Sequence, residues 1–139
     1  MSVLIEEFKK EHSEIVDTLK KVKEYGILTR EGQDKLMSVK PSLIEHLDVE
    51  DEKFYPVLWK EAEQNIKLKE ALQIFAKDLE NISRVVFGFF DSYDKGVLGD
   101  RLSGDFETLF MVIRYRMENE ENILYGEYEK IYQYLEVLV

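Results

Sequence analysis

Apolar residues recur at steps of three and four along nearly the whole chain, and this spacing constrains the fold more than any other feature of the sequence. It places the apolar side chains on one face of an α-helix. Four segments show it, with stripes that begin at Leu4, Leu36, Ile66 and Phe106. Long helices joined by short connections pack as antiparallel neighbours. We therefore predict an all-α, up-down-up-down antiparallel four-helix bundle, formed as one domain by residues 1–139.

Capping and breaking residues give the expected ends of these helices. The expected N-caps are Ser2 for the first helix and Thr29 for the second. Either Ser103 or Asp105 is expected to cap the fourth helix. Gly26 is expected to end the first helix. A glycine-rich loop is expected at residues 94–104, before the fourth helix. Pro41 is expected to bend the second helix or to reset its start.

Charge and composition exclude several classes of function. The net charge of -10 disfavours nucleic acid and membrane surfaces as partners. The chain has no cysteine, which excludes thiolate catalysis and disulfides. It also has no nucleophile motif and no phosphate-binding loop. We expect a cytoplasmic protein that is not an enzyme, because the sequence shows no signal peptide and any catalysis would need a metal.

Five ionisable residues lie on the apolar stripes, where the helices should face the core. They are His12, His46, Glu50, Arg116 and Glu120. Burying a carboxylate costs several kcal/mol unless it is paired or bound to a metal. His46 and Glu50 are four residues apart, so they lie one turn apart on one helix face. Imidazole and carboxylate together suit iron, manganese or zinc, and the pattern therefore indicates a buried cation site.

Simpler interpretations compete for the single residues. A lone histidine such as His12 on an apolar stripe is usually a hydrogen-bonded core residue. Tyr55, Tyr125 and Tyr128 are expected at the edge of the core, with buried rings and hydroxyl groups in water. The acidic runs 48–52 and 118–121 are expected to be solvated faces, apart from the two stripe glutamates.

A weak internal repeat relates the two halves of the sequence. The segment 46–55 aligns with 116–125, so that Glu50 falls on Glu120 and Tyr55 falls on Tyr125. In the same way the segment that begins at His12 aligns with 79–82. The repeat predicts a bundle with pseudo-twofold symmetry, in which equivalent positions face each other across the core.

Three short motifs together resemble the hemerythrin-like (HHE cation-binding) domain family. They are E-H-x-x-I at 11–15, H-L-x-x-E-D-x-x-F-Y-P at 46–56, and E-E-x-x-L-Y at 120–125. The resemblance extends from about Ile5 to Tyr132. Members of this family place two irons between four helices, with terminal histidine ligands and two bridging carboxylates. Carried over, the resemblance implies that His12 and His46 bind one metal and that Glu50 and Glu120 are the bridging carboxylates.

Two positions depart from the family pattern. Leu79 and Arg116 stand where the resemblance implies histidine ligands of the second metal, and the chain has only two histidines. We therefore expect an incomplete di-iron site and no reversible dioxygen carriage. Arg116 carries a permanent positive charge, and we expect it to substitute for the charge of the missing metal.

Two main states of the site and two functions stay open at this point, besides a two-metal site that uses other ligands. The site holds either one divalent ion, with iron, manganese and zinc all acceptable, or no metal, with Arg116 neutralising Glu50 and Glu120. The first state predicts a metal-binding protein that senses metal, oxygen or redox state. The second predicts a degenerate bundle that acts as a protein-interaction or regulatory module. Aromatic residues near the C-terminus, Tyr132 and Tyr134, leave a homodimer or another protein partner open.

Overall fold

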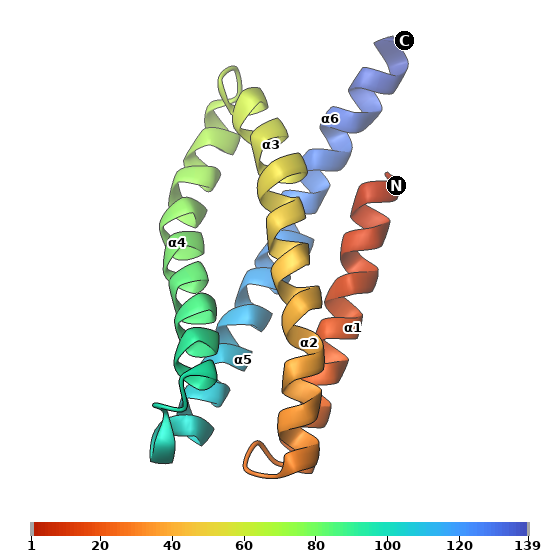
Figure 1. Cartoon of the computed structure of the whole chain (residues 1–139). Helices are drawn as coiled ribbons and strands as arrows, with labels where there is room; N and C mark the ends of the chain where they lie inside the picture. The colour runs from red at the N-terminus through yellow and green to blue at the C-terminus, as the bar shows by residue number, and fades with distance from the viewer. Residues whose placement is uncertain (1, 139) are drawn as a thin grey trace.

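The computed structural model describes residues 2–138, with side chains described up to residue 133. Within that range the chain is helical, without strands, and forms four long rods (Figure 1). The first rod is α1 (Val3–Tyr25), and the third is α4 (Ile66–Asp94). The other two rods each contain a π-helical segment: α2 (Arg30–Val49), η1 (Glu50–Phe54) and α3 (Tyr55–Ala62); then α5 (Leu102–Asn119), η3 (Glu120–Leu124) and α6 (Tyr125–Leu138).

The prediction of an all-helical chain with four long helices is confirmed. The loops at 26–29 and 95–101 lie at one end of the molecule, and the turn at 63–65 lies at the other end (Figure 1). The helix α6 extends past the start of α1 at that second end (Figure 1). Tyr132 on α6 is 37% exposed, whereas the side chain of Tyr134 lies outside the described residues. None of the described helices combines the length and apolar composition of a membrane span.

The expected ends of the first helix and the start of the second are confirmed. Ser2 Oγ accepts a hydrogen bond from the Ile5 N–H at 3.3 Å, and Thr29 Oγ1 accepts one from the Gly32 N–H at 3.0 Å. Each supplies an acceptor to an N–H that has no partner within the helix. Gly26 ends α1 with φ at 94°, a conformation that favours glycine because it has no Cβ.

The expected cap of the fourth helix is wrong, and so is one of the two outcomes expected at Pro41. The fourth rod begins at Leu102, so Ser103 and Asp105 lie inside its first turn, and Arg101 precedes it without a side-chain cap. The reason is a 3₁₀ turn at Gly99–Arg101, which leads the backbone directly into α5. Pro41 does not reset the start of the second helix, because α2 runs through it from Arg30. Pro41 lies on the exposed face, where the carbonyl group that loses its partner is close to water.

The apolar core is divided into two clusters with a polar layer between them. Along each contributing rod the clusters lie on either side of the buried polar residues. On α1, for example, Phe8 belongs to one cluster and Ile15 to the other, with His12 between them. The same order occurs around Glu50 and around Glu120. The layer therefore lies inside the bundle, closed above and below by hydrocarbon.

Candidate metal centre

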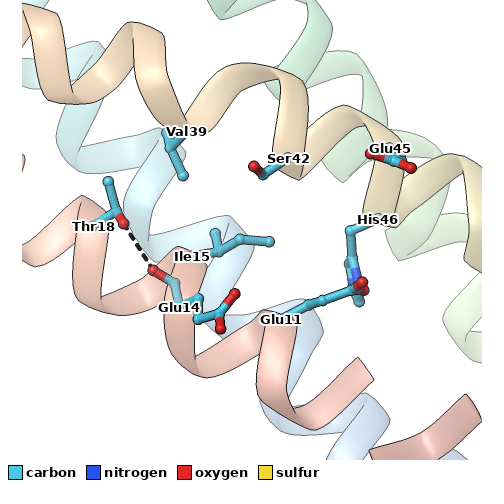
Figure 2. Close-up of a pocket in the computed structure, with 8 residues that line it drawn as sticks. All are labelled: Glu11, Glu14, Ile15, Thr18, Val39, Ser42, Glu45 and His46. Atoms are coloured by element: carbon cyan, nitrogen blue, oxygen red, sulfur yellow. Dashed lines mark hydrogen bonds and ion pairs between the residues drawn. The ribbon is translucent and has the colours of Figure 1, made fainter. Parts of the chain in front are cut away.

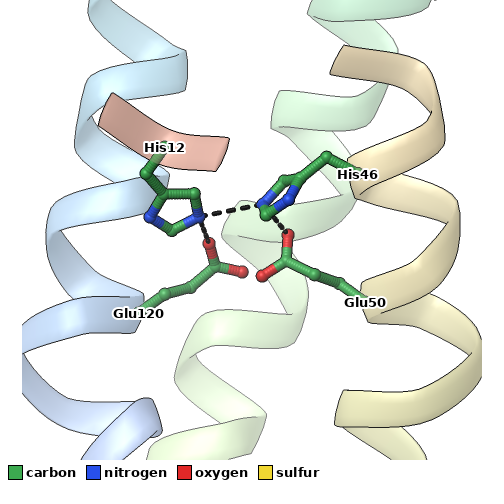
Figure 3. Close-up of side chains that lie close together, drawn as sticks. All are labelled: His12, His46, Glu50 and Glu120. Atoms are coloured by element: carbon green, nitrogen blue, oxygen red, sulfur yellow. Dashed lines mark hydrogen bonds and ion pairs between the residues drawn. The ribbon is translucent and has the colours of Figure 1, made fainter. Parts of the chain in front are cut away.

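Four ionisable side chains from three rods converge in the polar layer. His12 comes from α1, His46 from α2, Glu50 from η1 and Glu120 from η3 (Figure 3). Each residue is at most 3% exposed. One ligand atom from each of the four lies within 4.8 Å of the others. The prediction that these residues meet at one interior point is confirmed, and the cluster can hold a metal ion.

Both glutamates occupy the first position of a π-helical segment, η1 or η3. Such segments inside α-helices occur frequently at functional sites. A four-residue step advances a side chain by about 40° on an α-helix, and a wider π turn corrects this drift. His46, Glu50, Phe54, Leu58 and Ala62 are buried at steps of four, and so are Arg116, Glu120 and Leu124.

The imidazole Nε2 atoms of both histidines face the centre of the cluster (Figure 3). They lie 2.9 Å apart. The His46 Nε2 is 3.1 Å from Glu50 Oε1, and the His12 Nε2 is 3.6 Å from Glu120 Oε1. That Glu120 oxygen is buried and has no hydrogen-bond partner among the described residues. A buried carboxylate oxygen without a donor is costly, so this atom fits a site that takes a cation.

Two further glutamates hold the outer nitrogens of the same imidazoles. The His46 Nδ1 is 2.6 Å from Glu11 Oε1, and the His12 Nδ1 is 3.1 Å from Glu121 Oε1. When Nδ1–H donates to a carboxylate, the Nε2 lone pair stays available on the other side of the ring. This arrangement orients histidines that bind metal. The sequence analysis missed the role of both residues. It assigned Glu121 to a solvated acidic run and gave Glu11 no role of its own.

The expectation that the hydroxyl groups of Tyr55 and Tyr125 lie in water is wrong. Both residues are buried, at 6% and 1% exposed. The Tyr125 hydroxyl is 2.9 Å from His12 Nε2 and donates to Glu50 Oε2 at 3.2 Å. The Tyr55 hydroxyl donates to Glu120 Oε2 at 2.5 Å. Each tyrosine directly follows a π-helical segment, so its side chain reaches the glutamate of the other half.

Arg116 lies beside both central carboxylates. Its Nε donates to Glu120 Oε2 at 3.3 Å, and its Nη2 donates to Glu50 Oε1 at 3.4 Å. The guanidinium also lies over the Tyr55 ring, 5.7 Å from its centroid. A void of about 10 Å³ adjoins it, lined mainly by apolar side chains such as Ile82 and Val86. Leu79 is half-buried and packs against the core cluster that contains Phe8.

The surroundings of the two histidines shift their pKa values in opposite directions. Burial, with a further contribution from the neighbouring His46, lowers the pKa of His12 to about 3, so His12 is neutral near pH 7. Burial also opposes a charge on His46. Its bonds to Glu50 and Glu11 outweigh burial and raise the pKa of His46. The pair therefore combines one neutral imidazole with one that keeps its proton more readily.

The pKa values of the two central carboxylates are also shifted in opposite directions. Burial opposes ionisation of Glu50, but His46 and Arg116 outweigh it and lower the Glu50 pKa to about 2. Burial and the negative charge of Glu50 raise the pKa of Glu120 well above its ordinary value, against the attraction of Arg116. Two carboxylates this close cannot both ionise without more positive charge nearby. A metal ion would supply that charge and displace protons from the cluster.

Two surface grooves lead to the histidines. One has a volume of about 320 Å³ and lies between α1 and α2, where His46 and the carboxylates of Glu11, Glu14 and Glu45 line it (Figure 2). The other has a volume of about 260 Å³ and lies between α1 and α5, where His12 lines it. The cluster is therefore buried but close to the surface on both sides of α1.

Comparison with known proteins adds no relative: no protein-family model, curated protein or solved structure matches the chain. The class of protein thus follows from the fold and the site alone. The chain is an all-helical protein whose buried pair of histidines and pair of glutamates can hold a metal ion.

Proposed function

We propose that the chain is a hemerythrin-like metal-binding protein with an antiparallel, up-down-up-down bundle. One divalent cation is held by His12, His46, Glu50 and Glu120. The observation that carries this proposal is the buried cluster of four convergent ligand groups, in which Glu120 Oε1 has no donor of its own within the described residues. Arg116 contacts the other oxygen of Glu120, and a cation beside Oε1 would complete the interactions of this carboxylate.

The donor set favours iron, manganese or zinc over calcium or magnesium, because two of the four donors are imidazole nitrogens. The resemblance to the hemerythrin-like family favours iron among the three. Glu11 and Glu121 would orient the two imidazoles, and the apolar clusters on either side of the layer would limit access of water. A bound iron or manganese would supply one-electron redox chemistry at this position.

The second half of the site does not repeat the ligands of the first. Arg116 and Leu79 occupy the positions where the family resemblance implies histidines, so we propose a single ion rather than two. Reversible dioxygen carriage in the family uses two irons that exchange electrons with one ligand. This chain would instead bind its ion to sense metal, oxygen or redox state.

The direct test is the metal content of protein produced with added iron, manganese or zinc. We expect close to one equivalent of a single metal. Glu50→Gln should lose the ion, because it removes a charged ligand. Glu45→Gln, an exposed glutamate on the same rod, should keep it. Protein that is metal-free under all three conditions would contradict the proposal.

A second candidate function rests on Arg116, which already donates to both central carboxylates. In this alternative the bundle is a metal-free interaction or regulatory module, and the guanidinium alone compensates Glu50 and Glu120. Thermal unfolding with and without a chelator separates the two functions. A metal-binding protein should lose stability when its ion is removed, because the ion binds only the folded chain. A metal-free module should unfold at the same temperature with and without the chelator.

A further inference from the structure

The hydroxyl oxygen of Tyr125 contacts two of the four proposed ligands. It is 2.9 Å from His12 Nε2 and 3.2 Å from Glu50 Oε2. The two Nε2 atoms are 2.9 Å apart, and His46 Nε2 is 3.1 Å from Glu50 Oε1. Two donors bound to one ion at right angles, each at about 2.1 Å from it, lie about 3 Å apart. All four separations therefore fit atoms that are neighbours around one ion.

The packing of Tyr125 holds this oxygen in place. The residue is 1% exposed. Its ring stacks on His12 with centroids 5.5 Å apart and on Phe8 with centroids 5.8 Å apart. Phe54 meets the ring edge-on at 5.2 Å. Because three aromatic neighbours enclose the ring, the hydroxyl group cannot turn to water, and it stays directed at His12 and Glu50.

Tyr55 is the repeat-equivalent residue and has a different environment. Its hydroxyl donates to Glu120 Oε2, which is the oxygen that Arg116 also contacts. The histidine pair faces the other oxygen of that carboxylate, since His12 Nε2 lies nearest to Oε1. Tyr55 thus supports a carboxylate from the Arg116 side, and Tyr125 lies on the side of the histidines.

We propose that the Tyr125 oxygen is a fifth donor to the bound metal, and that it binds as a phenolate to ions that include Fe³⁺. The inference rests on the proposed metal-binding function. Two carboxylates and one phenolate carry three negative charges, and Arg116, which donates to both carboxylates, offsets one of them. A divalent ion would then balance the site, and Fe³⁺ would leave one net positive charge. As the bond between oxygen and metal forms, the hydroxyl proton leaves to solvent, and nothing is oxidised or reduced.

The experiment is titration of the purified protein with Fe³⁺, followed by absorption and resonance Raman spectroscopy. A phenolate bound to Fe³⁺ gives a visible charge-transfer band with tyrosine ring vibrations in resonance. The wild type and Tyr55→Phe should show the band. Tyr125→Phe should lose it and bind Fe³⁺ at least about tenfold more weakly. Far-UV circular dichroism checks that both variants are folded.

The other outcomes distinguish a failure of the Tyr125 assignment from a failure of the proposed metal binding. If Fe³⁺ binds but the band is absent from the wild type, or persists in Tyr125→Phe, the Tyr125 assignment is wrong while metal binding stands. If no Fe³⁺, Fe²⁺, Mn²⁺ or Zn²⁺ binds the wild type, the proposed function fails, and this inference fails with it. Should Tyr125→Phe not fold, Tyr55→Phe protein labelled with ring-deuterated tyrosine replaces it. Resonant modes that do not shift on labelling would then overturn the assignment.

Discussion

The two halves of the chain share one backbone device and differ in the chemistry built on it. Each half places a glutamate at the start of a π-helical segment and a tyrosine directly after it. Glu50 and Tyr55 occupy these positions in the first half, and Glu120 and Tyr125 in the second. The first half adds His12 and His46 to this frame. The second half places Arg116 and Leu79 at the corresponding positions of the sequence repeat.

The difference teaches how a buried pair of carboxylates can be compensated from two sides. Glu50 and Glu120 face the histidine pair on one side and the guanidinium of Arg116 on the other. Arg116 is a permanent cation supplied by the chain, whereas the histidines can give up their protons and bind a cation from outside. The first half, which has the two histidines, is thus suited to an ion. The second half supplies its positive charge through the side chain of Arg116.

The largest effect is expected from making the halves alike. Leu79→His combined with Arg116→His restores the ligands that the family resemblance implies, so the iron content should rise from one equivalent to two. Ile82→His with Arg116→His is the matched control, because it places the histidine one turn away, beside the small void. If the Ile82 pair gains the second iron instead, the alignment of the halves is wrong by one turn. If neither gains it, the second half is no relic of a metal site.

Removing Arg116 should cost the metal-free protein more than any other single change in the layer. Arg116→Leu leaves Glu50 and Glu120 buried without their guanidinium, and breaking such a pair costs about 3–5 kcal/mol. Urea unfolding in the presence of a chelator measures this. Arg114→Leu is the control: its partner Glu118 lies 3.7 Å away and both side chains are exposed, so the loss should be about 1 kcal/mol or less. Equal losses would show that Arg116 does not carry the charge balance.

The two halves should also contribute to the pH dependence of stability with opposite signs. The pKa of His12 falls on folding from 6.5 to about 3. Near pH 5.5 the unfolded chain therefore binds a proton there that the folded chain does not, and stability rises with pH. The pKa of Glu120 rises on folding, from 4.5. In the same range the folded chain holds the extra proton, so stability falls as pH rises, and the two slopes oppose each other.

Two variants separate these slopes in metal-free protein. Relative to the wild type, Glu120→Gln should make the unfolding free energy rise more steeply with pH, by about 1.4 kcal/mol per pH unit near pH 5.5. His12→Gln should change the slope by a similar amount in the opposite direction. Denaturant unfolding at several pH values measures both. If both variants changed the slope in the same direction relative to the wild type, the assigned protonation states would be refuted.

The smallest effect is expected from the outer carboxylates. Glu11→Gln and Glu121→Gln leave all four proposed ligands in place and remove only the charge that orients an imidazole. Metal affinity should fall about tenfold in each. The fall should be larger for Glu11→Gln, since Glu11 holds His46 at 2.6 Å and Glu121 holds His12 at 3.1 Å. Competition with a chromogenic chelator reports it, and unchanged affinity in both would remove these residues from the account.

The helices and the central residues were accessible from the sequence because both leave a periodic signal. Apolar stripes define the rods, and an ionisable residue on a stripe, such as His12 or Glu120, is conspicuous there. The outer carboxylates left no such signal, because 29 acidic residues offer many candidates and only the fold selects Glu11 and Glu121. The tyrosine hydroxyl groups were misplaced because the π-helical segments turn them inward, and a π turn has no characteristic residue type.

The central claim is that one metal ion lies between His12, His46, Glu50 and Glu120. Crystals of metal-loaded protein, with data collected on either side of the absorption edge of the metal, test it most directly. The account predicts a single anomalous peak within bonding distance of these four side chains. A cluster without a peak, with Arg116 closed on both carboxylates in protein supplied with excess metal, would contradict it.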